Sequence, residues 1–357
     1  MNIPEIILFG PNRVWRTYKG GKILDRLEGK VNPEDSHFPE DWISSTTRAV
    51  NRGREEIVEG LSELEYDDRK ISLVSLLGQF PDEFLGRNHV RKYGSEPHFL
   101  IKYLDSAIRL HLQAHPTIGF SRQYLGSDSG KTEAYIILGI REEISDPYIY
   151  LGFQRVPEKT LFREVIEKQE VHHLISFFEK ISVRPGDVFI VPGGLLHAIG
   201  EGIFMIEIME PSDFVVRLEY KRGGYLIPPD SRFMGRDVDF AIDMINFKRI
   251  TVDQVRTRYF CIPQPLMQQK GGIEEILIGP EKTRCFRVHR LTVWETFTKI
   301  ADSFYVGVVT KGNGSVRTRH EKHILKRWDR FFIPFNQKEV IFSGNGEMEI
   351  ILTFPPR

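Results

Sequence analysis

Residues 181–220 read ISVRPGDVFIVPGGLLHAIGEGIFMIEIMEPSDFVVRLEY, and this stretch decides the fold. Short apolar runs alternate with Pro-Gly-Asp and Pro-Gly-Gly turns, which is the pattern of β-strands joined by tight connections. In the run 203–209 the residues on both faces of the strand are apolar, with the exception of Glu207. A strand that is apolar on both faces lies inside a sandwich or barrel, so the stretch predicts a β-sheet core.

The motif GDVFIVP (186–192) returns 142 residues later as WDRFFIP (328–334). Each copy is followed by a further apolar run, GIFMIEIMEP in the first case and GEMEIILTFPP in the second. Two copies of one β-unit predict two similar β-domains. At this offset His197 corresponds to Glu339, so we expect that the second copy does not repeat the role of His197.

Helical spacing of apolar residues predicts three helices, at 47–64, 158–180 and 236–247. We interpret all three as scaffold. The part of the chain after the third helix consists of short strand-like runs, and we therefore place a domain boundary between residues 240 and 265.

Composition excludes several classes of protein. The 357 residues contain 49 Lys and Arg against 49 Asp and Glu, so there is no basic surplus of the kind that nucleic-acid binding needs. The most apolar stretch, 188–209, is interrupted by Pro192 and Glu207, and no segment is suited to span a membrane. We predict neither a nucleic-acid nor a membrane partner, and no protein partner.

The expected compartment is the cytoplasm. The start of the chain has no positively charged segment followed by a long apolar run, which argues against a signal peptide. The sequence has two cysteines, Cys261 and Cys285, which do not make a disulfide framework and suit a reducing environment.

The stretch HLQAHPT (111–117) places His111, Gln113 and His115 on one face of a predicted strand. Glu133 begins an apolar strand after Gly-Lys-Thr, and His197 follows a Pro-Gly-Gly turn. Together these side chains make a mixed nitrogen and oxygen ligand set, which suits Zn²⁺ or another divalent first-row metal. The alternative is that each one is an ordinary hydrogen-bonded residue.

Four blocks occur in a fixed order in the chain: QAHP (113–116), GKTE (130–133), PGGLLHA (192–198) and EIMEPSDFVVR (207–217). In this order they resemble the type I mannose-6-phosphate isomerases, which are zinc enzymes of the cupin superfamily. The earlier segments VWRTYKGGKIL (14–24) and PEDWISS (39–45) are similar to the family's W-G-G-x-x-L and G-E-x-W-x-x-S patterns. The resemblance covers about residues 12–220.

The resemblance implies a mainly β fold of two cupin-type jelly-roll domains, with a few added helices in the N-terminal part. Residues 1–250 would form the catalytic cupin domain with helical insertions, and 251–357 a cupin-like domain without the metal site. One Zn²⁺ per chain would be held by the four residues that match the family's zinc ligands, Gln113, His115, Glu133 and His197.

The implied reaction is the interconversion of mannose 6-phosphate and fructose 6-phosphate through a cis-enediol. Lys131, Glu207 and Arg217 match the family's active-site lysine, glutamate and arginine. A carboxylate in an apolar strand has a raised pKa and can serve as a base, although Glu207 can also be a structural partner of an arginine. We expect Glu207 or Lys131 to move the proton and Arg217 to stabilise negative charge.

The departures from the family pattern affect the phosphate end. His111 stands where the family has a serine of its phosphate site, and Thr117 where it often has an aspartate. A protonated histidine can bind phosphate, and the expected substrate-binding residues are Trp15, His111, Lys221 and Arg222. Two alternatives remain: an isomerase of the same family that acts on a different or unphosphorylated sugar, and a non-catalytic sugar-binding cupin.

Overall fold

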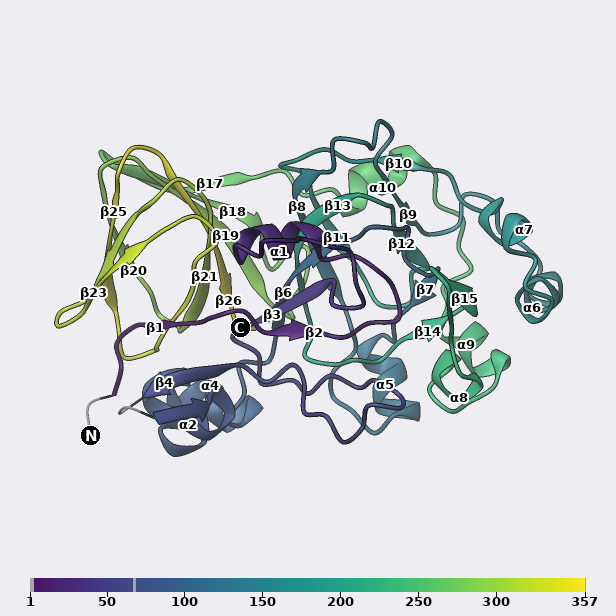
Figure 1. Ribbon diagram of the computed structural model, residues 1–357, viewed down its shortest axis with the longest axis horizontal. Coiled ribbons are helices and arrows are strands. Elements are labelled where there is room, and N and C mark those ends of the chain that lie inside the picture. Colours follow the sequence, from purple (N-terminus) through teal and green to yellow (C-terminus); the bar gives the residue numbers. More distant parts are fainter. Residues whose placement is uncertain (1–2, 67–68, 357) are drawn as a thin grey trace.

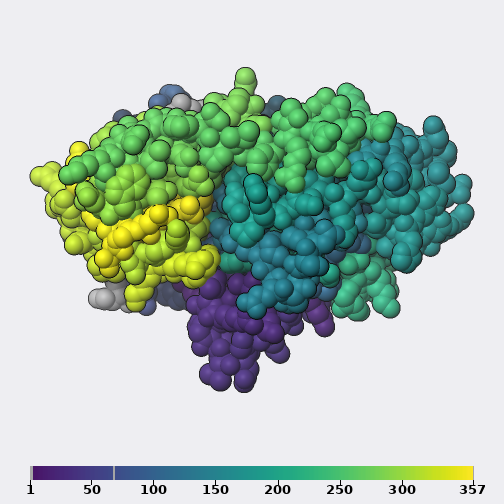
Figure 2. All heavy atoms as spheres, turned by 90° about the horizontal axis from the view of Figure 1, so that it is seen from above, coloured from purple at the N-terminus to yellow at the C-terminus, as the bar shows by residue number. Residues whose placement is uncertain are grey.

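The computed structural model describes residues 3–66 and 69–356. Two β-units lie side by side, each built from two antiparallel sheets (Figure 1). Seen from above, the C-terminal residues form one end of the molecule and residues of the first unit form the other (Figure 2). The prediction of a mainly β fold with two β-domains is confirmed.

The first unit pairs a six-stranded sheet with a five-stranded sheet. The six-stranded sheet has, in spatial order, β11 (Val188–Val191), β8 (Glu133–Ile140), β13 (Ile203–Met209), β6 (Leu100–Asp105), β3 (Glu40–Ile43) and β2 (Arg13–Val14). The five-stranded sheet has β10 (Ile181–Ser182), β9 (Tyr148–Leu151), β12 (His197–Ile199), β7 (Gln113–Ala114) and β14 (Val216–Arg217). The chain changes sheet at each step from β10 to β14, so the stretch 181–220 closes the two sheets around one interior.

The second unit has a seven-stranded and a four-stranded sheet. The larger sheet has β1 (Ile7–Leu8), β24 (Arg330–Ile333), β21 (Tyr305–Lys311), β26 (Met348–Phe354), β19 (Arg287–Val293), β18 (Gly272–Ile278) and β17 (Gln264–Gln269). The smaller sheet has β20 (Thr296–Ile300), β25 (Glu339–Gly344), β22 (Gly314–Arg317) and β23 (Lys322–Leu325). Two hairpins stand apart from these sheets, β4 (Glu63–Tyr66) with β5 (Arg69–Ser72) and β15 (Lys221–Arg222) with β16 (Tyr225–Leu226).

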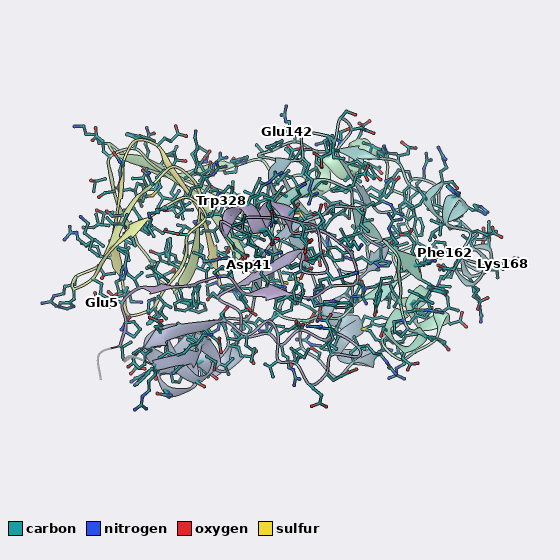
Figure 3. All side chains as sticks on the ribbon, viewed as in Figure 1. Glu5, Asp41, Glu142, Phe162, Lys168 and Trp328 are labelled. Atoms are coloured by element: carbon teal, nitrogen blue, oxygen red, sulfur yellow. The ribbon has the colours of Figure 1, made fainter. Side chains whose placement is uncertain are left out.

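The N-terminal segment belongs in space to the second unit. Strand β1 pairs with β24. Figure 3 shows Glu5 beside the second unit. The Glu5 carboxylate accepts hydrogen bonds from Thr318 and His320 of that unit. Residues 5–8 therefore contribute to the second unit, although they lie in the first of the two predicted domains. The division of the chain at residue 250 stays a prediction.

The repeated motif marks equivalent strands. The motif copies become β11 and β24, which pair with β8 and β21 in matching registers. In these registers Val191 faces Glu133 and Ile333 faces Tyr305, so Tyr305 stands where the first unit has Glu133. At the offset of the repeat, His197 begins β12 and Glu339 begins β25.

Among the described residues the helices are short, and none of them is long and apolar enough to cross a membrane. They are α1 (Lys22–Leu27), α2 (Leu73–Gln79), α3 (Pro81–Leu85), α4 (Arg87–Tyr93), α5 (Ile118–Tyr124), α6 (Lys159–Glu167), α7 (Val171–Ile175), α8 (Pro229–Arg232), α9 (Val238–Met244) and α10 (Val252–Tyr259).

Two of the three predicted helical segments are confirmed. The segment 158–180 contains α6 and α7, separated near Gln169, which has a left-handed backbone (φ 54°). The segment 236–247 contains α9, capped by the Asp237 side chain. The prediction of a helix at 47–64 is wrong, because this segment folds back on itself with a hydrogen bond from Ala49 N to Glu59 O.

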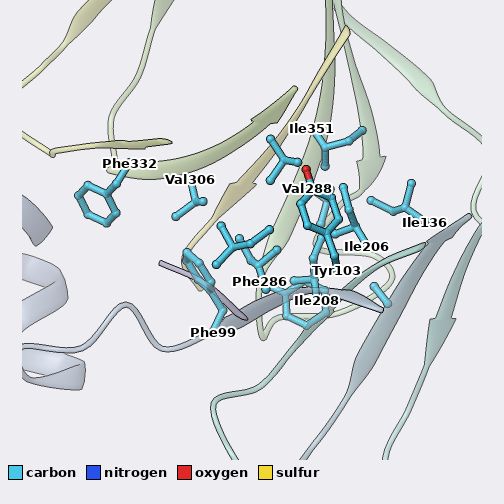
Figure 4. Close-up of a cluster of buried hydrophobic side chains, with 14 of the residues drawn as sticks. Phe99, Tyr103, Ile136, Ile206, Ile208, Phe286, Val288, Val306, Phe332 and Ile351 are labelled. Atoms are coloured by element: carbon cyan, nitrogen blue, oxygen red, sulfur yellow. The ribbon is translucent and has the colours of Figure 1, made fainter. Parts of the chain in front are cut away.

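The two units share one apolar core. Ile206 and Ile208 on β13 point away from the first unit's interior, toward Phe286, Val288 and Ile351 of the second unit (Figure 4). Because alternate residues of a strand face opposite sides, Glu207 between them faces the interior of the first unit. The second unit thus covers the outer face of the sheet that carries Glu207.

Polar and aromatic contacts strengthen the same junction. Asp41 on β3 forms a buried ion pair with Arg330 on β24. Trp328 packs its ring against Tyr103 and Phe204, with centroid distances of 6.1 and 5.5 Å. Figure 3 places Asp41 and Trp328 between the two units, where they fix the position of the six-stranded sheet.

Candidate metal centre and active site

Three buried side chains converge inside the first unit. His115 directly follows β7, Glu133 begins β8 and His197 begins β12, so both sheets contribute. One ligand atom from each residue lies within 4.8 Å of the others. Gln113 on β7 lies directly opposite His197 in the sheet, which brings all four predicted metal ligands together.

Hydrogen bonds to the backbone fix the orientation of both histidine rings. Nδ1 of His115 lies 2.7 Å from the carbonyl oxygen of Phe214, and Nδ1 of His197 lies 2.9 Å from that of Leu195. A carbonyl oxygen only accepts, so each Nδ1 carries the hydrogen and each Nε2 presents a lone pair. Burial lowers the pKa of both rings, that of His115 to about 3, which keeps them in the neutral form that binds metals.

The converging atoms are nearly all acceptors. Nε2 of His115 lies 2.9 Å from Oε1 of Glu133, and Nε2 of His197 lies 3.4 Å from Oε2 of the same carboxylate. Among the described residues, neither His115 Nε2 nor Glu133 Oε1 has a hydrogen-bond partner. Lone pairs placed this closely repel one another unless a cation lies between them, so the residues fit a metal ion.

The amide of Gln113 completes the set. Its Nε2 is placed 3.3 Å from Nε2 of His197, and exchange of the amide nitrogen and oxygen puts the carbonyl oxygen at the same point. In that orientation Gln113 offers a neutral oxygen ligand. The donor set of two imidazole nitrogens, one carboxylate and one amide oxygen is compatible with Zn²⁺.

The loop before Glu133 is held by the last of the four sequence blocks. The Glu210 carboxylate accepts hydrogen bonds from the backbone N–H groups of Gly130 (3.0 Å) and Thr132 (2.8 Å), and Ser212 Oγ donates to the Gly130 carbonyl (2.6 Å). A Cβ at Gly130 would lie 2.7 Å from the Pro116 carbonyl oxygen, so this close approach requires glycine. These contacts link the QAHP, GKTE and EIMEPSD blocks in one structure.

Glu207 lies in a buried charge network that sequence reasoning missed. Its Oε2 is 3.1 Å from Nζ of Lys102, the residue directly opposite on β6, and Lys102 is also 3.0 Å from Glu40 Oε1. Burial, with the charge of Glu133, raises the pKa of Glu207 to about 8. One signal in the sequence was available: Lys102 stands in an apolar strand just as Glu207 does.

Glu40 anchors this network from the PEDWISS segment. Its carboxylate accepts hydrogen bonds from Arg16 Nε (2.9 Å), Trp42 Nε1 (2.8 Å) and Tyr18. Burial alone would raise the pKa of Glu40, but the charges of Arg16 and Lys102 outweigh it and lower the pKa. Glu40 therefore stays ionised and holds Lys102 beside Glu207.

These side chains surround a small inner cavity that joins a larger outer cleft. The inner cavity, about 30 Å³, is lined by Lys131, Glu133 and Glu207 among others, and it has room for about one water molecule. The outer cleft, about 560 Å³, shares Asp213, Val215 and Arg217 with it. A third space, a cleft of about 680 Å³, lies between α4 and the second unit, away from the predicted metal ligands.

Arg217 stands where the two spaces meet. Its strand β14 places it opposite Gln113, and its side chain donates a hydrogen bond to the Ser231 carbonyl (3.4 Å). Burial lowers the pKa of Arg217, although the nearby Asp213 charge acts in the opposite direction. Lys131 lies deeper, with Nζ 3.5 Å from Glu133 Oε1. Both predicted cations therefore face the cavity that Glu207 lines.

The predicted substrate-binding residues fall into two groups. Trp15 lines the outer cleft, stacked on His37 and edge-on to Tyr225, and His111 lines the inner cavity.

Lys221 and Arg222 line neither of these two spaces. Lys221 is exposed on β15, and Arg222 donates to the Arg109 carbonyl and pairs with Glu219. The turn after β14 carries both side chains away from the ligands, and their predicted role remains a prediction.

Known proteins resemble this chain in fold and, over part of its length, in sequence, although no protein-family model matches the chain. Over 252 residues, 70% of this chain and 72% of the relative, it is 34% identical to a mannose-6-phosphate isomerase of Bacillus subtilis. A crystal structure of mannose 6-phosphate isomerase from Bacillus subtilis covers 98% of this chain and 99% of its own, with a TM-score of 0.73 and 19% identity. A mannose 6-phosphate isomerase solved with bound zinc and yttrium covers 99% and 100%, with a TM-score of 0.69 and 14% identity.

Fold and site together define a two-domain cupin-type protein with a buried triad able to hold a metal ion beside an open cleft. The identity of 34% over 72% of the relative shows that the chain belongs to the mannose-6-phosphate isomerase family, and it is an isomerase. The structural match extends over both β-units, so the second unit is part of the shared fold.

Proposed function

We propose that this protein is a zinc-dependent aldose–ketose isomerase that interconverts mannose 6-phosphate and fructose 6-phosphate. The observation that carries the proposal is the placement of Glu207 in the same small cavity as Glu133 and Gln113 of the metal-ligand set. The relative of 34% identity is named for this reaction, and one structural neighbour was solved with zinc.

The cofactor would be one Zn²⁺ per chain, held by Gln113, His115, Glu133 and His197. When bound, it would supply a Lewis acid that polarises oxygen atoms of the open-chain sugar. The buried, backbone-oriented histidine rings support this assignment, because such outer hydrogen bonds fix the rings of metal-ligating histidines.

Glu207 is the proposed base for proton transfer. It takes the proton from C2 of the aldose, the electron pair forms the C1–C2 double bond, and the C1 oxygen gains negative charge. The proton then returns from Glu207 to C1 on the same face, and the proton of the O2 hydroxyl passes to O1, so that O1 becomes a hydroxyl and C2 the carbonyl carbon of the ketose. The pKa of Glu207, raised to about 8 by burial, makes this carboxyl a base of suitable strength near neutral pH.

Lys131 and Arg217 would stabilise the negative charge that develops on the sugar oxygens. Lys131 reaches the inner cavity beside Glu133, and Arg217 reaches it from the outer cleft. Donors already aimed at the place where charge develops need no rearrangement during the reaction. We assign the base to Glu207 rather than Lys131 because Lys131 lies next to a carboxylate and serves better as a cation.

The inner cavity is too small for a hexose phosphate, so the substrate would extend into the outer cleft. The reacting carbons would lie at the mouth of the inner cavity beside Arg217, and the remainder of the substrate near Trp15. A second candidate is an isomerase of the same family for a different or unphosphorylated sugar. It is favoured by the placement of Lys221 and Arg222 outside both spaces and by the burial of His111.

We also propose a cytoplasmic location, supported by the free cysteines Cys261 and Cys285.

The test is a coupled assay that follows ketose formation from mannose 6-phosphate and from mannose, on zinc-loaded protein. Glu207→Gln should lower turnover by about 10²–10⁴-fold, the usual contribution of a general base. Glu142→Gln, which changes an exposed carboxylate, is the matched control and should leave turnover unchanged. EDTA should abolish turnover and added zinc should restore it.

Turnover of mannose alone would favour the second candidate. Turnover that survives EDTA, or a Glu207→Gln variant as active as the parent, would contradict the proposed mechanism. No turnover of either sugar by zinc-loaded protein would favour a non-catalytic sugar-binding cupin.

A further inference from the structure

His111 lines the inner cavity and carries a buried nitrogen atom without a hydrogen-bond partner among the described residues. Its side chain is 1% exposed and lines the cavity with Gln113 and Arg217. Among the described residues, its Nε2 has no hydrogen-bond partner. A buried polar atom without a partner costs free energy, so the position is explained best by a partner that arrives with the substrate.

The backbone determines which kind of partner fits. Nδ1 of His111 lies 2.9 Å from the carbonyl oxygen of Glu219, so Nδ1 carries the hydrogen and donates it. Nε2 of the neutral ring then has a lone pair and can only accept.

The ring is also held firmly. The Glu219 carboxylate accepts hydrogen bonds from the backbone N–H of Leu112 (2.6 Å) and from both terminal nitrogens of Arg109 (2.8 and 2.6 Å). These bonds clamp the segment that carries His111 to the segment that supplies the carbonyl. Nε2 is therefore held in a fixed position beside the cavity that His111 lines.

We propose that His111 Nε2 accepts a hydrogen bond from a hydroxyl group of the sugar, and that the phosphate lies toward Arg217 and the outer cleft. A phosphate dianion offers only acceptor oxygens to His111, whereas a sugar hydroxyl offers the hydrogen that Nε2 lacks. His111 is then a specificity-determining residue for a hydroxylated carbon. This inference rests on the proposed function and replaces the expectation that a charged His111 binds phosphate.

The test uses hexitol 6-phosphates, which lack the carbonyl group and cannot be isomerised. Binding of mannitol 6-phosphate and of its 3-deoxy and 4-deoxy forms to zinc-loaded protein is measured by calorimetry. His111→Phe removes the acceptor and keeps a ring, His111→Gln keeps an acceptor oxygen, and His173→Phe changes an exposed histidine as the matched control.

We expect His111→Phe to weaken binding of mannitol 6-phosphate about tenfold, the usual effect of one lost hydrogen bond to a buried group. One of the two deoxy compounds should bind the parent protein about tenfold more weakly, with no further loss in His111→Phe. His111→Gln should recover part of the affinity, and His173→Phe should match the parent protein.

If the affinity lost through His111→Phe and the affinity lost through each deoxy compound simply add up, the inference is overturned, since His111 would then affect binding only through the structure. If His111→Phe no longer binds zinc, His111 is a metal ligand and the inference is overturned. If that variant does not fold, ¹⁵N spectra of the parent protein decide. Nε2 of His111 must be unprotonated and must shift on addition of mannitol 6-phosphate, and an unchanged signal rejects the inference.

The binding test of His111 gives an answer that does not depend on the turnover assay of the proposed function, because binding of a hexitol phosphate needs no turnover. Coupling between His111 and a hydroxyl without turnover of mannose 6-phosphate would reject the proposed function and keep the inference. Turnover without coupling would keep the proposed function and reject the inference.

Discussion

Lys102 and Glu207 face each other across neighbouring strands β6 and β13, with Nζ 3.1 Å from Oε2, inside the barrel that holds the metal-ligand triad. Lys102 divides its positive charge between Glu207 and Glu40. Glu40 has further donors in Arg16 and Trp42, whereas Glu207 depends on Lys102 alone among the ion pairs found in the described residues. Because Glu207 has fewer stabilising partners than Glu40, Glu207 takes up a proton more easily than Glu40 does.

The pH dependence of the reaction should follow Glu207. Burial raises the pKa of this carboxyl to about 8, so the protonated form predominates below that value and the basic form above it. Because the proposed mechanism needs the basic form, kcat/KM should increase with pH up to about 8 and then level off. A pH profile of kcat/KM measures this. A profile that decreases over the same range would contradict the assignment.

Replacement of Lys102 by methionine should move that profile. Loss of the cation removes an attraction that favours the ionised carboxyl, so the pKa of Glu207 should increase by about 1–3 units and the profile should shift to higher pH. Lys159→Met, which changes a mostly exposed lysine, is the control and should leave the profile in place. An unshifted profile for Lys102→Met would show that this lysine does not control Glu207.

The four sequence blocks were sufficient to predict that Gln113, His115, Glu133 and His197 lie close together, because each block fixes one strand end or turn of the site. Lys102 was missed because its partner Glu207 lies 105 positions away and only strand pairing brings them together. Glu210 was missed for a similar reason, since its partners are backbone N–H groups, which leave no mark in the sequence. Lys221 and Arg222 were favoured because they follow Arg217 closely in the sequence; they line neither the inner cavity nor the outer cleft, and their role stays a prediction.

The fold was predictable where patterns were long or repeated. The repeat of 142 residues correctly aligned β11 with β24, because each copy occupies the same place in its sheet. The helix expected at 47–64 rested on only three apolar residues, and one of them, Ile57, is exposed in the structure. Short helices such as α1 and α4 carry too few turns to produce a visible period.

Zinc should stabilise the parent protein more than a variant that lacks the Glu133 carboxylate. This carboxylate lies beside Nε2 of His115 and Nε2 of His197, and Lys131 Nζ pairs with it at 3.5 Å. Glu133→Gln leaves Lys131 buried without its counter-charge, so the variant should melt at a lower temperature than the parent in metal-free protein. Zinc should widen this difference, because the parent gains more binding free energy.

Thermal unfolding with EDTA and with zinc measures the difference in both conditions, and Glu142→Gln serves as the exposed control. If Glu133→Gln is less stable than the parent to the same extent in both conditions, the triad is not a metal site.

Neighbouring residues of β13 should separate stability from activity. Ile206 is fully buried against the second unit, so Ile206→Ala should lower the free energy of unfolding by about 2–5 kcal/mol with little effect on KM. Ile300→Ala, at a side chain that is 59% exposed, should change it by less than about 0.5 kcal/mol. Urea unfolding of the zinc-loaded proteins compares the two. Equal losses would mean that the interface between the units contributes little to stability.

The second unit contains a buried charge cluster whose effect should appear only in stability. Glu274 on β18 lies 2.6 Å from both His289 Nδ1 and Lys299 Nζ. Burial alone would raise the pKa of Glu274, but hydrogen bonds from His289 and Lys299 outweigh it and lower the pKa. Because the folded protein then holds the ionised form more strongly than the unfolded chain, this stabilisation is present above about pH 4.5 and is lost at lower pH.

Glu274→Gln should therefore destabilise the protein by about 3–5 kcal/mol at pH 7, because Lys299 is left buried without its counter-charge. The difference from the parent should shrink as the pH decreases below about 4.5, where the parent also loses its ionised Glu274. Glu275→Gln changes the adjacent, half-buried carboxylate paired with Arg290 and should cost less than about 1 kcal/mol. Urea unfolding between pH 4 and 7, with kcat/KM measured in parallel, tests this. A lowered kcat/KM in correctly folded Glu274→Gln would show that the second unit reaches the active site.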